Sequence, residues 1–239
     1  AIDGVLFTAD GTHLVCYPAY KTGSYVVPEG TLYIDYDAFR ENGYLSGITF
    51  PSTLRKIDDY AFSWCYRLAS VTFPENITFI GDSAFRSCTG LKNVTFQSDT
   101  VTLDGYVFAG CRGLRTITLP AKLTAIPNGL LSDCVSLSSI TIPAGVTSIG
   151  GSAFQNCTSL PSITIPVGIT SISSSAFTGC SNLKSVYIDD LSAYCKISFS
   201  STSSAPTYNS AKLYVKGTEL TKLTIPEDVT TIKYATFYK

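Results

Sequence analysis

Apolar and polar residues alternate along most of the chain in a pattern that repeats every 23 residues. The clearest copy runs from Leu137 to Cys157, and the next copy repeats its apolar positions in the same order. Three markers keep this spacing: prolines at Pro28, Pro51, Pro74, Pro120, Pro143 and Pro166, large apolar residues at Phe39, Phe62, Phe85, Phe108, Leu131, Phe154 and Phe177, and cysteines at Cys65, Cys88, Cys111, Cys134, Cys157 and Cys180. A fixed period of roughly 20–50 residues is the mark of a repeat solenoid.

Each copy predicts a strand followed by a compact turn. In one copy, Val71 and Phe73 alternate with Ser70 and Thr72, which predicts a short strand with the apolar side chains facing inward. Pro74 ends this strand because proline has no N–H to donate to a ladder. Further on, residues 82–88 place alanine and cysteine four positions apart, which suits one or two helical turns.

The period and the L-x-x-I-x-I core fall in the range of leucine-rich repeats. We therefore predict an α/β leucine-rich repeat solenoid, wound as a right-handed superhelix of about nine coils. A parallel β-sheet would form one face, and short helical turns would lie opposite. Open solenoid ends need a cap, and Asp10-Gly11 between two β-prone runs predicts an N-terminal β-hairpin cap that covers the first repeat strand.

The predicted organisation is a single domain over residues 1–239. Residues 1–23 form the cap, 24–188 the regular repeats, 189–219 an insertion, and 220–239 a final incomplete repeat. We expect the insertion to begin with a short helix capped by Asp190 and to lead into a hairpin of residues 212–215 and 220–225.

The repeat cysteines among the eight predict a ladder of free buried thiols rather than disulfides. Six of them recur at one phase, where stacked coils would hold equivalent Cβ vectors nearly parallel, a poor geometry for a bridge. Cysteine packs well as a small apolar residue. No metal site is expected, because the chain has no C-x-x-C pair and a single histidine, His13.

Charge and composition argue against several classes of binding partner. The net charge is −1 with 15% charged residues, so no nucleic-acid partner is expected. No apolar run approaches the length of a membrane span, so we expect no membrane insertion within this chain. The chain starts at Ala1 and contains no methionine, so we expect a processed or excised piece whose signal and anchor lie outside it.

The sequence resembles the BspA-type leucine-rich repeat proteins of bacterial surfaces. The resemblance rests on the Ile-Pro-x-x-Val-Thr-x-Ile-Gly-x-x-Ala-Phe-x-x-Cys-x-x-Leu pattern of residues 142–160, and on the non-repeat segments 3–7, 14–18, 190–199 and 212–217. It implies a secreted or cell-surface protein, with an extracellular location. Relatives include adhesins for host matrix proteins and for other bacteria, and the family motif carries no catalytic residues.

The residues themselves predict no catalytic site and no cofactor. His13 has no nucleophile at a motif spacing, and Asp58-Asp59 suits a turn better than an acid pair. Trp64 is expected on the helical side, mainly in a packing role.

The candidate ligand-binding residues are the outward positions of the sheet. They form one file of Thr72, Thr95, Thr118, Thr141, Thr164 and Tyr187. The plain interpretation is that threonine suits an exposed strand. The functional one is a non-enzymatic extracellular adhesion module that binds a protein, such as a matrix protein, through this face. The alternatives are a structural spacer or self-associating element without a ligand, and a glycan-binding module; the oligomeric state stays open.

Overall fold

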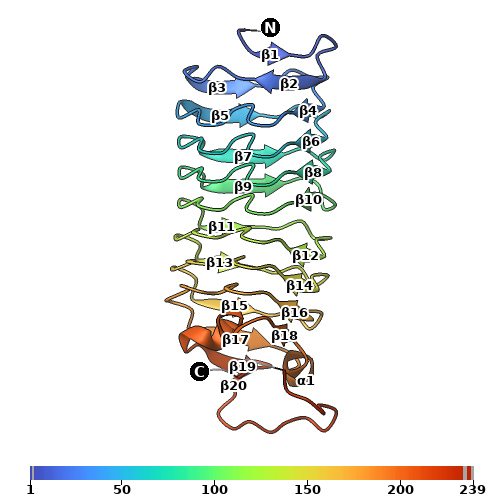
Figure 1. Ribbon diagram of the computed structural model, residues 1–239, viewed down its shortest axis with the longest axis vertical. Coiled ribbons are helices and arrows are strands. Elements are labelled where there is room, and N and C mark those ends of the chain that lie inside the picture. The colour runs from blue at the N-terminus through green and yellow to red at the C-terminus, as the bar shows by residue number, and fades with distance from the viewer. Residues whose placement is uncertain (2, 234–235, 238–239) are drawn as a thin grey trace.

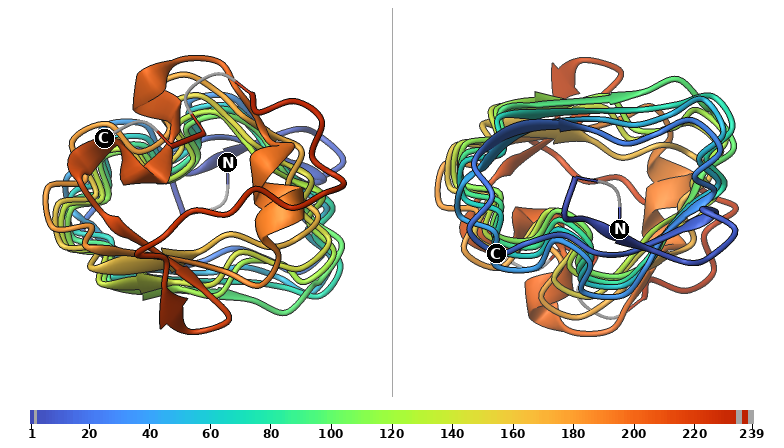
Figure 2. Two further views of the ribbon diagram at one scale, coloured as in Figure 1. Left: turned by 90° about the horizontal axis from the view of Figure 1, so that it is seen from below. Right: turned by 90° about the horizontal axis from the view of Figure 1, so that it is seen from above.

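The computed structural model describes residues 1, 3–233, 236 and 237. The chain winds into a stack of about nine coils, with the N-terminus at one end of the long axis and the last coils at the other (Figure 1). Seen along that axis, the coils superpose into one oval outline (Figure 2). The protein is thus a β-solenoid with little helix, and the expected α/β class is wrong in its helical part.

Two strand ladders run along the stack, where the sequence predicted one sheet. The first ladder consists of β3 (Gly23–Val26), β5 (Leu45–Thr49), β7 (Ser70–Phe73), β9 (Asn93–Phe96), β11 (Thr116–Ile117), β13 (Ser139–Ile140), β15 (Ser162–Thr164), β17 (Ser185–Ile188) and β19 (Lys212–Val215). The second ladder consists of β2 (His13–Cys16), β4 (Tyr33–Ile34), β6 (Lys56–Ile57), β8 (Phe79–Ile80), β10 (Thr102–Leu103), β12 (Ala125–Ile126), β14 (Ser148–Ile149), β16 (Ser171–Ile172) and β18 (Ser198–Phe199). Where neighbouring repeat strands are hydrogen-bonded they pair in parallel, as in Ser70↔Asn93 of the first ladder, and each ladder is divided into shorter sheets.

The segment after each second-ladder strand forms turns and not the expected helix. Amide donors alternate along it: Ala84 N donates to Gly81 O in its own coil at 3.3 Å, and Phe85 N donates to Val107 O in the next coil at 2.9 Å. A helix would use every amide within its own segment. The alternation requires left-handed backbone at Ser83 and Ser87, with φ of 55° and 60°. We call this side of the molecule, built from residues 82–90 and their equivalents, the turn ladder.

Stacked aromatic rings form the centre of the core. Phe39, Phe62 and Phe85 are at most 1% exposed, and their ring centroids lie 4.5 Å and 4.9 Å apart in successive coils. Burying a side chain of this size contributes about 1.5–3 kcal/mol. A single coil has nothing to bury its rings against, so each coil depends on the stacking of its neighbours.

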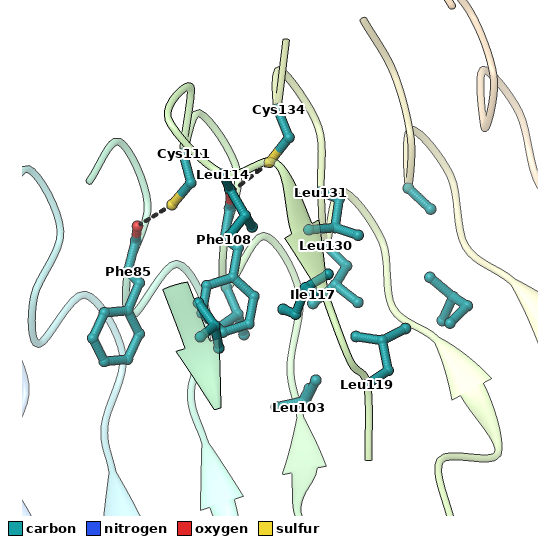
Figure 3. Close-up of a cluster of buried hydrophobic side chains, with 14 of the residues drawn as sticks. Phe85, Leu103, Phe108, Cys111, Leu114, Ile117, Leu119, Leu130, Leu131 and Cys134 are labelled. Atoms are coloured by element: carbon teal, nitrogen blue, oxygen red, sulfur yellow. Dashed lines mark hydrogen bonds between the residues drawn. The ribbon is translucent and has the colours of Figure 1, made fainter. Parts of the chain in front are cut away.

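The repeat cysteines link each coil to the one before it. The Cys111 Sγ donates to Phe85 O, and the Cys134 Sγ to Phe108 O, both at 3.2 Å (Figure 3). The same bond recurs at Cys65, Cys88, Cys157 and Cys180. Phe85 O also accepts from the Cys88 amide at 3.2 Å, so both of its acceptor sites are used.

All eight cysteines are free and the six repeat cysteines are fully buried, which confirms the predicted ladder of thiols. Burial raises the pKa of the Cys65 thiol to about 12, from an ordinary value of 9.0. It raises the pKa of the thiols in the middle of the stack as well, as at Cys88 and Cys111.

The N-terminal residues form the expected hairpin. β1 (Leu6–Phe7) pairs antiparallel with β2, and β2 lies beside β4 in the second ladder. The hairpin therefore extends the second ladder and does not lie on the edge of β3, the first strand of the other ladder. Its role as a cap stays a prediction.

Residues 189–219, expected as an insertion, continue both ladders with a coil of 27 residues. β18 pairs with β16 and β19 with β17, each in parallel. The connections contain α1 (Leu191–Cys195), η1 (Thr202–Ser204) and η2 (Pro206–Asn209). The Asp190 side chain caps α1 by accepting from Ala193 N at 2.9 Å, as predicted.

The end of the chain differs from the predicted hairpin. β19 pairs antiparallel with β20 (Thr218–Glu219), which lies closer along the chain than the expected partner at 220–225. The described residues of the expected final repeat, 220–239, contain no strand, and 234–235 and 238–239 lie outside the described residues. Phe237 still packs against the core, with its ring centroid 6.3 Å from that of Tyr194.

Candidate functional site

The outward face of the first ladder, which we call the strand face, carries the predicted file of ligand-binding residues. Strand alternation turns their neighbours inward: Val71 is 2% exposed and Phe73 is fully buried. Strand pairing then aligns the outward side chains, with Thr72 opposite Thr95. All six members are exposed: Thr72, Thr95, Thr118, Thr141, Thr164 and Tyr187. Thr164 likewise lies opposite Tyr187, while Thr118 and Thr141 directly follow β11 and β13. The binding role of the six residues is a matter for proposal.

An aromatic pair lies at the C-terminal end of this file. Tyr187 of β17 is in register with Thr164 on one side and Tyr214 of β19 on the other. The rings of Tyr187 and Tyr214 are 5.0 Å apart between centroids at an angle of 32°. The sequence reasoning missed Tyr214 because its coil is 27 residues long, so the residue does not fall at the 23-residue phase.

One ion pair borders the aromatic pair. Lys212 Nζ lies 3.0 Å from Glu219 Oε1, which joins the two strands of the hairpin β19–β20. The hydrogen bond to Glu219 raises the pKa of Lys212. The rest of the file carries hydroxyl groups, which both donate and accept hydrogen bonds. This arrangement suits reversible binding of a polar partner around an aromatic anchor.

The residues considered for chemistry have structural partners. His13 Nδ1 lies 2.7 Å from Asp35 Oδ1, and the His13 ring stacks on Tyr33. Asp58 pairs with a lysine, while Asp59 accepts from the Asp82 amide of the next coil at 2.9 Å. Within residues 1, 3–233, 236 and 237, no group of three or more histidine, cysteine or acidic side chains could hold a metal ion. No helix in that part of the chain is long and apolar enough to cross a membrane.

The stacked coils with their repeating apolar core place the molecule in the class of leucine-rich repeat solenoids. The profile of the BspA type leucine-rich repeat region, in six copies, matches residues 15–137 and 124–239. The chain belongs to this family. Among curated proteins, none matches the sequence.

Several solved bacterial structures share the fold. The leucine-rich repeat protein TpLRR of T. pallidum aligns over 86% of both chains, with a TM-score of 0.60 and 24% identity. A leucine-rich repeat protein from Bacteroides ovatus gives 0.62 and 24% over 80% of this chain and 54% of its own. The pneumococcal vaccine antigen PcpA gives 0.53 and 21%, over 80% of this chain and 42% of its own. The protein thus spans about half, or less, of the last two chains.

Proposed function

We propose that the protein is a non-enzymatic extracellular adhesion module that binds a protein ligand, such as an extracellular-matrix protein, through the strand face. The observation that supports this most is the file of exposed hydroxyl groups that ends in the Tyr187–Tyr214 pair. Aromatic residues dominate the energetics of protein interfaces, and a rigid platform lowers the ordering cost of binding.

The extracellular location is part of the same proposal. Its support is membership of the BspA-type family and the fold shared with the antigen PcpA. A surface with little charge also favours contact with partners through shape and hydrogen bonds rather than through steering by charge.

The test is a binding screen of the whole chain against immobilised extracellular-matrix proteins. A Tyr187→Ala variant is run beside it, with Thr218→Ala in the hairpin as a control. We expect at least one ligand whose affinity falls about tenfold or more in Tyr187→Ala, as for a central aromatic anchor. A ligand that binds both variants like the parent would remove the strand face from the proposal. If no protein on the panel binds and the chain self-associates in a sedimentation series, the alternative of a structural spacer or self-associating element is favoured.

A further inference from the structure

A second exposed surface lies on the turn ladder of the N-terminal coils. Trp64 and Tyr66 are each 43% exposed and Tyr106 is 36% exposed, although the sequence predicted mainly a packing role for Trp64. The ring centroids of Trp64 and Tyr66 lie 6.1 Å apart at 69°, an edge-to-face contact. All three residues lie in turns, so this surface shares no residue with the strand face.

Two of these aromatic residues occupy strained backbone positions. Trp64 has a φ of 69° and Tyr106 a φ of 54°. At the same phases, later coils have residues that tolerate left-handed backbone more easily, such as Asn156, Gly129 and Gly179. A bulky side chain in this backbone conformation costs conformational energy. The partial burial of each ring offsets only part of that cost. Strained residues whose rings stay this exposed often mark a functional site.

The same residues line a groove of about 460 Å³. This volume lies in the range of roughly 300–1,000 Å³ that is typical of small-ligand sites. The small residues Ala109 and Gly110 lie between the aromatic side and Asp133 on the other side. Ala109 is only 4% exposed, and a Cβ added to Gly110 would lie 3.1 Å from Ser87 Oγ. The groove is therefore hollow because these two side chains are small.

Arg86 and Arg112 place two guanidinium groups at the groove. Arg86 lies over the Tyr106 ring, 5.8 Å from its centroid, and Arg112 lies in the next coil. Among the described residues, neither arginine forms an ion pair. Asp133, the acidic residue of the lining, accepts from Asn156 Nδ2 at 2.8 Å. The planar fork of arginine matches a carboxylate or sulfate group.

We propose that this groove binds an acidic oligosaccharide. Arg86 and Arg112 hold its carboxylate or sulfate groups, and the Trp64 ring packs against the apolar face of a sugar ring. Gln155, which also lines the groove, offers hydrogen bonds to the sugar hydroxyls.

The backbone of the turn ladder argues against an acidic peptide that binds as an added strand. Its amides already donate within and between coils, as Trp64 N donates to Arg86 O at 2.8 Å and Gly110 N to Ser132 O at 2.7 Å. A peptide would find no free strand edge for the main-chain hydrogen bonds that give extended segments their affinity. A sugar depends on side chains and stacking alone, which this groove supplies.

The chain carries its own reporter for a direct test, because Trp64 is its single tryptophan. The whole protein is titrated with an oligogalacturonate, which carries carboxylates, with a heparin-derived oligosaccharide, which carries sulfates as well, with neutral cellotetraose and with hexaglutamate. We expect a saturable change in Trp64 emission with one or both acidic sugars, weakened by added salt. Equal binding of the neutral sugar or of the peptide would overturn the proposal, as would the absence of any change together with no heat of binding.

Variants then locate the site by calorimetry. Arg112→Ala is expected to weaken the acidic sugar at least tenfold, while Arg115→Ala, an exposed arginine outside the groove lining, leaves binding unchanged. Ala109→Gln, which introduces the side chain found at the same phase in Gln155, should fill the groove and abolish binding without unfolding the coil. Equal losses of affinity in Arg112→Ala and Arg115→Ala would show that the sugar binds through general charge, and would contradict the proposed site. Tyr187→Ala should leave sugar binding intact, which separates this inference from the function proposed for the strand face.

Discussion

The two halves of the turn ladder have one backbone and two different surfaces. In both halves the amides alternate between coils, as Phe85 N donates to Val107 O and Phe154 N donates to Ala176 O, each at 2.9 Å. In both halves a thiol reaches back to the preceding coil, at 3.2 Å from Cys111 to Phe85 O and 3.0 Å from Cys180 to Phe154 O. The shared parts all point inward or along the stack.

The outward positions differ. The N-terminal half presents Trp64, Arg86 and Tyr106, whereas the equivalent positions of the C-terminal half hold small polar residues and glycine, such as Ser152 and Gly179. The inner positions of a repeat must suit their neighbours in every coil, but the outer positions contact solvent or a ligand. The comparison therefore separates residues needed for the stack from residues free to acquire a function.

The interior that the two halves share should show the largest effect at alkaline pH, as a loss of stability. The pKa of Cys65 in one half and of Cys180 in the other are both raised to about 12 by burial, from 9.0. The folded state thus holds these protons more tightly than the unfolded chain. The contribution of the protonated thiols to the free energy of unfolding is therefore complete below pH 9 and is lost as the pH rises toward 12. Each buried thiol contributes about 1.4 kcal/mol of this loss per pH unit. Six thiols acting together reach the size of a whole domain's stability at about one to two units above pH 9.

The measurement is the denaturant midpoint from pH 7 to 11, followed by circular dichroism. Cys111→Ala and Cys157→Ala serve as paired variants, one from each half, and each should reduce the pH dependence by the share of one thiol. A flat profile above pH 9 would show that the thiols ionise without opening the stack.

A smaller effect is expected from single core rings. Phe85→Ala and Phe154→Ala each remove a fully buried ring from the stack, and each should cost about 3–5 kcal/mol because a cavity remains. The two losses should agree within about 1 kcal/mol if the interior of the two halves is equivalent. Urea unfolding of the two variants measures them. A loss twofold larger in one half would break the comparison and show that one end of the stack bears more of the stability.

The smallest effect is expected at the outer positions. Trp64→Asn introduces the residue found at the same phase at Asn156, which accepts left-handed backbone more easily than tryptophan. The relief of strain offsets the lost packing of a half-exposed ring, so the stability should change by less than about 1 kcal/mol. Thermal unfolding of this variant beside Phe85→Ala is the measurement. A loss comparable to that of Phe85→Ala would assign Trp64 to the core.

The period predicted the inner half of each coil well. The residues at the phases of Phe85 and Cys88 are buried as expected, because only a fixed stacking distance makes apolar residues recur at one spacing. The prediction of helical turns was wrong because Ala84 and Cys88 share a face in a helix and equally in a chain of turns. The better signal was the glycine at Gly110 and Gly179, at the phase of Ser87, which indicates left-handed backbone.

The candidate site was predictable only where the register held. Alternation placed Thr72 and Tyr187 on one face. Tyr214 was not predicted, because its coil has four extra residues between β17 and β19. The groove on the turn ladder was hidden for another reason. Trp64, Arg86 and Tyr106 are distant in sequence and become neighbours only when the turns stack, so no single repeat shows them together.

The double use of the Phe85 carbonyl has a consequence for how such chains change over time. Because each coil offers the same thiol and carbonyl that it receives, an in-frame duplication or deletion of one repeat in the gene can keep this bond between the coils that remain. The protein is therefore open to growth and shortening by whole units. Its outer residues can diversify in each new copy, while the thiol and the carbonyl behind them are inherited unchanged.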